Sequence, residues 1–118
     1  MSDHNNNLGR FFEDYAVGDI ITHATPRTLT EADKSLYISI YPTRFALQSS
    51  AEFARNCGLK DRPLDDLIVF HTVFGKTVPD ISINAVANLG YAEGIFSKLV
   101  FSGETLSVTS EIIGLNKN

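Results

Sequence analysis

The sequence predicts an α+β domain in which an antiparallel β-sheet wraps around one central helix. Residues 67–78 place apolar side chains at helical spacing on all sides, and a helix of that kind must be surrounded by other structure. Residues 105–112 instead alternate with the period of two that is typical of a strand. We expect the sheet to lack its last strands, because residues 116–118 resemble a turn with no strand after it.

Length and composition indicate a single domain, expected over residues 10–118. The 118 residues are 43% apolar and 20% charged, values that argue against disorder. The net charge of −4 comes without a cluster of lysine or arginine, which disfavours nucleic acid and anionic membranes as partners. Cys57 is the only cysteine, and the chain shows neither a signal-like segment nor a run of about 20 apolar residues. We therefore expect a soluble, cytoplasmic protein without an internal disulfide.

The N-terminal part is expected to start with a mobile arm, residues 1–9, which has little to bury. An aromatic-rich segment then docks on the rest of the domain and ends at a turn formed by Gly18 and Asp19. The following residues, 20–29, are strand-like, and Pro26 is expected to interrupt that strand or confine it to a sheet edge. The docking side chains are Phe11, Phe12, Tyr15 and Val17.

Two capping boxes predict two short helices in the next part of the chain. Thr30 and Asp33 have the spacing at which each side chain satisfies the other's backbone N–H, so we expect a helix over residues 31–41 that Pro42 stops. Ser49 and Glu52 form a second box before a short helix that ends at Gly58. This second helix is expected to bury Phe53, Ala54 and Cys57.

The central helix is expected to start near Pro63, Asp65 and Asp66, since proline suits a first helical turn and carboxylates offset the helix dipole. Its β-branched content leaves a buried strand open as an alternative. Pro79 and Asp80 should end it, and residues 81–96 should form a strand. One face of the helix carries Leu67, Phe70, His71, Phe74 and Val78.

The common catalytic motifs are missing from the sequence. No glycine-rich phosphate loop, CxxC pair, HExxH or GxSxG occurs, which removes the main support for nucleotide, zinc and serine-hydrolase functions. No histidine has the partners of a metal site; the i±4 neighbours of His71 are Leu67 and Gly75. We expect His71 to be buried and hydrogen-bonded, with a catalytic role as the alternative. Lys76 is expected to be a solvated helix end, with phosphate binding as the alternative.

The loop over residues 43–50 is the candidate site. It carries hydroxyl groups, an arginine and an amide between two helix boundaries, where backbone donors are free. A plain polar connector with an N-cap is the alternative interpretation.

Several segments resemble the MaoC-like hydratase family, which has the hotdog fold. Residues 96–106 are similar to the family pattern F-x-x-P-V-x-x-G-D-T-L, with Leu99 and Glu104 in place of the proline and the aspartate. Residues 44–50, 67–80 and 84–92 closely resemble the N-terminal half of mesaconyl-CoA hydratases, also called β-methylmalyl-CoA dehydratases. The resemblance covers roughly residues 10–118.

The resemblance implies an enoyl-CoA hydro-lyase without a cofactor or metal, acting between mesaconyl-CoA and β-methylmalyl-CoA. The family's catalytic aspartate and histidine match Thr43 and Gln48 here. Neither residue can act as a general base, whose contribution is typically ~10²–10⁴ in rate. The catalytic residues therefore stay unassigned, with His71 as a weak candidate. The family carries its catalytic loop in a second, C-terminal hotdog unit.

The resemblance thus implies that this chain is an N-terminal hotdog unit that supports the fold and shapes the substrate pocket. The implied partners are a CoA thioester and a second hotdog unit, either a C-terminal half or another copy. A non-catalytic module that binds acyl-CoA or assembles with another hotdog is the alternative. The implied substrate-binding residues are Arg44, Gln48, Ser49 and Ser50.

Overall fold

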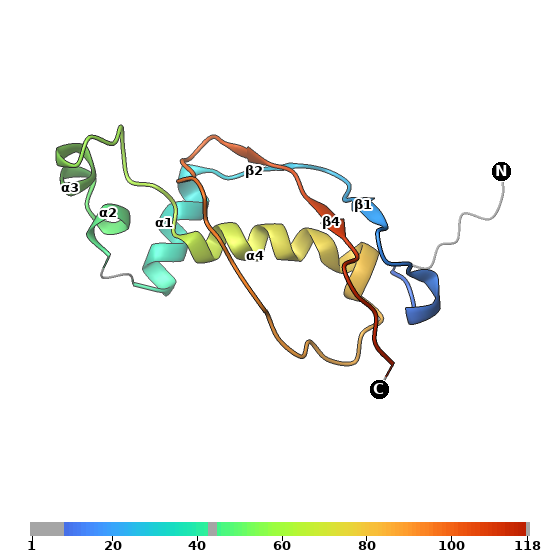
Figure 1. The fold of residues 1–118 in the computed structure, drawn as a ribbon. Helices are drawn as coiled ribbons and strands as arrows, with labels where there is room; N and C mark the ends of the chain where they lie inside the picture. Colours follow the sequence, from blue (N-terminus) through green and yellow to red (C-terminus); the bar gives the residue numbers. More distant parts are fainter. Residues whose placement is uncertain (1–8, 43–44, 118) are drawn as a thin grey trace.

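The computed structural model describes residues 9–42 and 45–117. It consists of one long helix, α4, with a two-stranded ribbon along one side and short helices beyond its N-terminal end (Figure 1). The elements in chain order are η1 (Phe12–Asp14), β1 (Ile20–Thr22), β2 (Arg27–Thr28), α1 (Glu31–Ile40), α2 (Ala46–Ser49), α3 (Ala51–Asn56), α4 (Asp66–Thr77), η2 (Val78–Ser82), β3 (Thr105–Leu106) and β4 (Thr109–Glu111).

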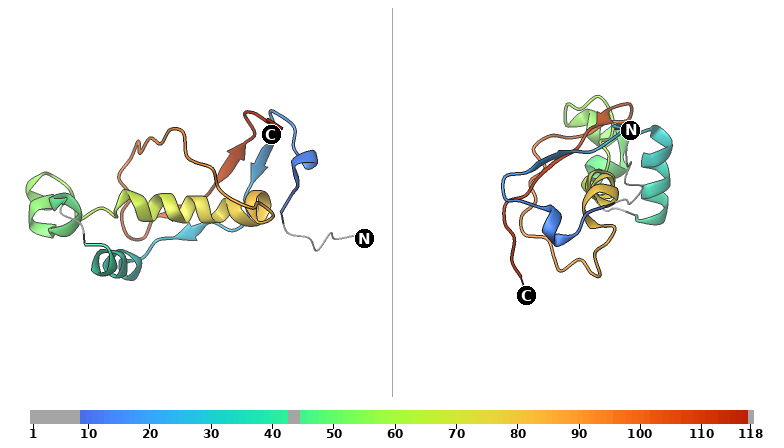
Figure 2. Two further views of the ribbon diagram at one scale, coloured as in Figure 1. Left: turned by 90° about the horizontal axis from the view of Figure 1, so that it is seen from below. Right: turned by 90° about the vertical axis from the view of Figure 1, so that its right-hand side faces the viewer.

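The ribbon joins the two strand-like parts of the chain. β1 pairs antiparallel with β4, and β2 pairs antiparallel with β3. Between these pairs residues 23–26 lie opposite residues 107–108, so the first strand bulges, and Thr25 there has a φ of 55°. The expected interruption at Pro26 is confirmed. Residues 18–29 and 103–112 nevertheless stay hydrogen-bonded from Gly18 to Leu29, and the left view of Figure 2 shows this ribbon crossing α4 obliquely.

The period-two alternation of the last strand is also confirmed. Side chains at 106, 108, 110 and 112 are at least partly buried, whereas those at 105, 107, 109 and 111 are exposed. Val108 turns inward beside Ile21 and Leu29, which are buried on the partner strand. The ribbon therefore contributes most of the small apolar core.

Helix α1 has the predicted capping box. The Thr30 hydroxyl accepts from the Asp33 N–H at 3.2 Å, and the Asp33 carboxylate accepts from the Thr30 N–H at 2.9 Å. This bond from the Thr30 backbone lowers the pKa of Asp33 below its ordinary value. The helix ends at Ile40, one residue earlier than expected.

A buried lysine connects α1 to the segment before α4. Lys34 is 1% exposed, and its Nζ lies 2.9 Å from the Glu31 carboxylate and 3.5 Å from that of Asp61. It also donates to the Arg62 carbonyl oxygen at 3.2 Å. Hydrogen bonds from Lys34 and Ser102 lower the pKa of Glu31, and a bond from the Arg62 backbone lowers that of Asp61. We refer to these residues as the Lys34 cluster.

The second capping box is one residue out of place. Ser50, not Ser49, caps α3, and its hydroxyl accepts from the Phe53 N–H at 3.1 Å. Only Ala54 of the three expected inward side chains is buried, because Phe53 and Cys57 lie on the exposed side of this short helix. The predicted end at Gly58 is confirmed: its φ is +91°, and the Leu59 N–H bonds to the Ala54 carbonyl at 3.0 Å.

Helix α4 confirms the predicted helix and excludes the alternative of a buried strand. Both of its ends differ from expectation. Asp65 is the N-cap and accepts from the Leu67 N–H at 2.8 Å, while Pro63 lies before the first turn. At the other end Pro79 does not stop the helix. The chain widens into the π-helical turn η2, where the Ile83 N–H reaches the Val78 carbonyl at 2.9 Å and the missing proline donor is accommodated.

The prediction that α4 is wrapped on all sides is wrong for the described chain. Within α4 only Thr72 is buried, and Leu67 and His71 are exposed, contrary to the expected burial of His71. The strand expected over residues 81–96 is also absent: residues 81–82 belong to η2, and residues 83–99 are exposed without regular structure. The physical reason is that no strand of the described residues lies beside this segment.

The segment 83–99 touches α4 mainly through an aromatic cluster. The Tyr91 ring meets the rings of Phe70 and Phe74 edge-on, with centroids 5.3 and 5.5 Å apart. The radius of gyration is 17.6 Å, whereas a compact domain of this length has about 13 Å. The molecule therefore has the open shape of a fold with part of its sheet missing.

The N-terminal segment is fixed at the far end of α4. The Tyr15 hydroxyl donates to the Ile81 carbonyl at 2.7 Å, whereas Phe11, Phe12 and Val17 remain exposed. Gly9, which the sequence places in the arm, lies against Ile83: a side chain at this position would clash with that residue. Residues 1–8 of the expected arm lie outside the described residues.

Candidate functional site

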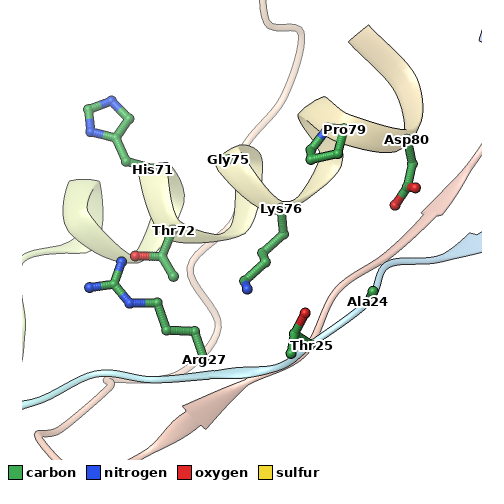
Figure 3. Close-up of a pocket in the computed structure, with 9 residues that line it drawn as sticks. All are labelled: Ala24, Thr25, Arg27, His71, Thr72, Gly75, Lys76, Pro79 and Asp80. Atoms are coloured by element: carbon green, nitrogen blue, oxygen red, sulfur yellow. The ribbon is translucent and has the colours of Figure 1, made fainter. Parts of the chain in front are cut away.

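A pocket of about 500 Å³ lies between the ribbon bulge and the C-terminal half of α4 (Figure 3). This volume is within the range of small-molecule sites. One wall comes from the bulge and the other from α4 and η2. The lining residues are Ala24, Thr25, Arg27, His71, Thr72, Gly75, Lys76, Pro79 and Asp80.

The ribbon wall owes its shape to the bulge. The strand bends because the four residues 23–26 lie opposite only two residues, 107–108. Thr25 also has a left-handed φ, which a β-branched residue rarely adopts. Bulges of this kind often occur beside functional sites, where they redirect side chains. Arg27 follows the bulge, and its side chain rises from the ribbon toward Thr72 (Figure 3).

The helix wall presents polar groups over the bulge. The Lys76 side chain points from α4 toward the ribbon at Thr25 (Figure 3). The Thr72 hydroxyl donates to the Ile68 carbonyl at 2.8 Å and is therefore already engaged. Gly75 leaves open space between them, since no atom lies within 4 Å of where its Cβ would be.

A hydrogen-bonded chain of three side chains closes the end of the pocket. His23 is 6% exposed, and its Nδ1 lies 2.6 Å from a carboxylate oxygen of Asp80. Its Nε2 lies 2.8 Å from the Ser110 hydroxyl on β4. Asp80 lines the pocket but Ser110 does not, so the serine is no nucleophile for a ligand bound there. These three hydrogen-bonded side chains instead fix the Asp80 carboxylate and connect η2 to the ribbon.

Sequence reasoning did not find this chain of residues. His23 and Asp80 are 57 positions apart, and His23 and Ser110 are 87 apart. The only available signal was the alternation that turns Ser110 inward among mostly apolar neighbours.

His71 lines the same pocket but points away from its centre. In Figure 3 its ring lies on the side of α4 opposite Lys76 and Arg27. Its ring centroid is 5.7 Å from that of Phe70. The geometry thus offers no support for His71 as a base within this pocket.

The predicted substrate-binding residues that the structure describes, Gln48, Ser49 and Ser50, lie elsewhere. Thr43 and Arg44 are outside the described residues, and Gln48 is buried on α2. The Ser49 hydroxyl donates to the Phe45 carbonyl at 3.2 Å, and that of Ser50 caps α3. Helices α2 and α3 lie beyond the N-terminal end of α4, away from the pocket at its C-terminal half (Figure 1). The structure therefore does not bring the predicted residues to this pocket.

A second pocket, of about 480 Å³, lies between α1 and the start of α4. The rings of Tyr37 and Tyr41 meet there with centroids 5.2 Å apart. Burial raises the pKa of Tyr37 above its ordinary value, so the phenol stays protonated near neutral pH. The lining residues are Tyr37, Ile40, Tyr41, Pro42, Asp65 and Leu67.

Neither a metal site nor a membrane span is found in the part of the chain that the structure describes. No group of three or more His, Cys, Asp or Glu side chains comes together across residues 9–42 and 45–117. No helix among the same residues is long and apolar enough to cross a membrane.

Comparison with known proteins gives one consistent result. The family model described as mesaconyl-CoA hydratase matches residues 2–118. The chain is 61% identical to the β-methylmalyl-CoA dehydratase of Chloroflexus aurantiacus over 112 residues, which are 95% of this chain and 32% of that protein. It is also 61% identical to the mesaconyl-CoA hydratase of Cereibacter sphaeroides, with 95% and 33% covered. The chain thus spans about a third of the length of these relatives.

A solved structure of a MaoC domain protein dehydratase from Chloroflexus aurantiacus has the same fold. The TM-score is 0.91 at 59% identity, and the match covers 98% of this chain and 33% of the other. Nearly the whole chain therefore superposes on one third of that structure.

Proposed function

Because the chain belongs to the mesaconyl-CoA hydratase family, we propose that it is the N-terminal hotdog unit of a cytoplasmic hydro-lyase that interconverts mesaconyl-CoA and β-methylmalyl-CoA. The observation that carries the proposal is the 61% identity across 95% of the chain to relatives three times as long. In this role the chain supports the fold and shapes the thioester pocket, while the general base comes from the rest of the protein.

The residues at the family's catalytic positions support this division of roles. Thr43 and Gln48 carry a hydroxyl and an amide, which do not accept a proton near neutral pH. Gln48 is also buried on α2. We assign Arg44, Gln48, Ser49 and Ser50 to binding the thioester on the part of this chain.

The open face of α4 supports a second hotdog unit as the partner. Residues 83–99 expose Val86, Leu89 and Ile95 fully or almost fully. Their backbone groups find no strand to pair with in the described chain, and an unpaired apolar segment is a template for strand addition. The second unit, either a C-terminal half or another copy, would cover this segment and surround α4.

The proposal is tested with a chimera in which this chain replaces the matching third of the Chloroflexus aurantiacus dehydratase. We expect the chimera to hydrate mesaconyl-CoA, followed by loss of the enoyl-thioester absorbance. The 118-residue chain alone should be slower by at least ~10², the usual contribution of a positioned base. Equal turnover by the chain alone would overturn the proposal and place a base within these residues. If the chimera folds but is inactive, the alternative function of the chain as an assembly or acyl-CoA-binding module would be supported instead.

A further inference from the structure

We infer that the pocket between the ribbon bulge and α4 binds an oxyanion, with Lys76 as its main contact and Arg27 as the second. The inference deepens the proposed function and rests on it, because a thioester of coenzyme A with a dicarboxylic acid carries oxyanions at both ends. The two sources are the acyl carboxylate and the phosphates of the coenzyme.

The first step is the state of Lys76. Its side chain is half-buried and points into the pocket (Figure 3). No carboxylate of residues 9–42 or 45–117 lies within 4.0 Å of its Nζ, the distance at which an ion pair is counted. A lysine in the last turn of a helix is also favoured by the helix dipole, and that accounts for its residue type. The dipole does not account for what happens to its neighbour Asp80.

The second step is the diversion of Asp80. A lysine and an aspartate four positions apart normally face each other on a helix and pair. Here Asp80 belongs to η2, and its carboxylate is hydrogen-bonded to His23 at 2.6 Å. The carboxylate that lines the pocket is therefore engaged with His23 and makes no ion pair with Lys76.

The third step is the charge of the pocket as a whole. Arg27 adds a second cation, whose Nη2 donates to the Asp33 carboxylate at 2.7 Å. A guanidinium has further N–H donors, and its stem turns toward Thr72 at the pocket (Figure 3). The pocket thus holds Lys76, which has no ion pair among the described residues, and Arg27, which is paired with Asp33, beside the hydrogen-bonded carboxylate of Asp80. An oxyanion between Lys76 and Arg27 would accept from the unpaired ammonium and from the guanidinium N–H groups that Asp33 does not use.

The test titrates the isotopically labelled 118-residue chain with mesaconate and, separately, with adenosine 3′,5′-bisphosphate, at constant ionic strength, and follows amide shifts around Lys76. We expect one of these anions to bind and Lys76→Gln to weaken that binding at least tenfold. Lys98→Gln removes the same charge at an exposed position outside the pocket and should leave binding unchanged. Binding of mesaconate would assign the site to the acyl carboxylate, and binding of the bisphosphate would assign it to the coenzyme.

Asp80 provides an independent arm of the same test. Asp80→Asn removes the only carboxylate of the pocket and should tighten anion binding several-fold. Ser110→Ala removes the hydrogen bond between Ser110 and His23 without changing charge. It should change anion binding less than Asp80→Asn does. The inference is overturned if neither anion binds, or if Lys76→Gln and Lys98→Gln weaken binding equally, which is the result of unspecific attraction.

The chimera separates this inference from the proposed function. If anion binding depends on Lys76 but the folded chimera is inactive, the anion site is supported and the hydratase role is rejected. An active chimera whose KM for mesaconyl-CoA is unchanged by Lys76→Gln, together with no anion binding, would keep the role and reject the site.

Discussion

The two faces of α4 differ in what covers them. On one side lies the ribbon, in which Ile21, Leu29 and Val108 are buried and hydrogen bonds run from Gly18 to Leu29. On the other side residues 83–99 pass without regular structure, and the Tyr91 ring packs edge-on against Phe70 and Phe74. The difference supports the proposal that a second unit covers the side of α4 that the ribbon leaves open.

The largest difference is expected between two leucines, one on each face. Leu29 is 0% exposed, and Leu29→Ala should lower the free energy of unfolding by about 2–4 kcal/mol because it leaves a cavity. Leu89 is 88% exposed, so the matched change Leu89→Ala should cost less than about 0.5 kcal/mol. Urea unfolding followed by circular dichroism measures both. Equal effects of the two changes would remove the distinction between a closed and an open face.

The Lys34 cluster should come next in size. Lys34→Ala removes the cation that joins Glu31, Asp61 and the Arg62 carbonyl and should cost about 1–3 kcal/mol, since a buried acceptor is left unpaired. Lys98→Ala is the control, because that lysine is exposed. The same urea titration reports the difference. A loss no larger than that of the control would mean that the buried lysine does not stabilise the closed side.

The α1 cap should give a smaller effect. Thr30→Ala loses the hydroxyl that accepts from the Asp33 N–H and should cost about 1 kcal/mol. Thr30→Ser keeps the acceptor and should restore most of that stability. If serine is no better than alanine, the cap hydrogen bond is not the source of the effect.

The smallest effect is a dependence on acid. The pKa values of Glu31, Asp33 and Asp61 are lowered in the folded chain, so their ionised forms stabilise it above their ordinary pKa, near 4, and this contribution is lost as the pH falls further. The urea concentration at which half of the chain is unfolded should therefore decrease once the pH drops below about 4. Asp33→Asn should make that fall shallower. A variant whose midpoint follows the same curve as the parent would show that the Asp33 carboxylate contributes nothing.

Local chemistry explains which features could be predicted from the sequence. The Thr30 box, the end at Gly58 and the alternation of residues 105–112 each depend on neighbours within a few positions. The strand expected over residues 81–96 depends on a partner strand, and its apolar pattern alone cannot supply one. The expected burial of His71 failed for the same reason.

The pocket shows the same limit more sharply. Its walls come from residues 24–27 and 71–80, and although Pro26 predicted an interruption of the strand, no local pattern showed that this place would face α4. Lys76 was recognised as a possible phosphate contact, but His23, which is hydrogen-bonded to Asp80, was not. The resemblance to a family assigned the chain as a whole, and the contacts within the pocket required the structure.

Hydrogen exchange on residues 83–99 tests most directly whether the open face of α4 receives a second unit. The account predicts rapid amide exchange for these residues in the 118-residue chain and strong protection in the chimera with the remainder of the Chloroflexus aurantiacus dehydratase. Residues 103–112 of the ribbon provide the internal reference, because they are hydrogen-bonded already. Residues 83–99 that exchange equally fast in both proteins would contradict the account.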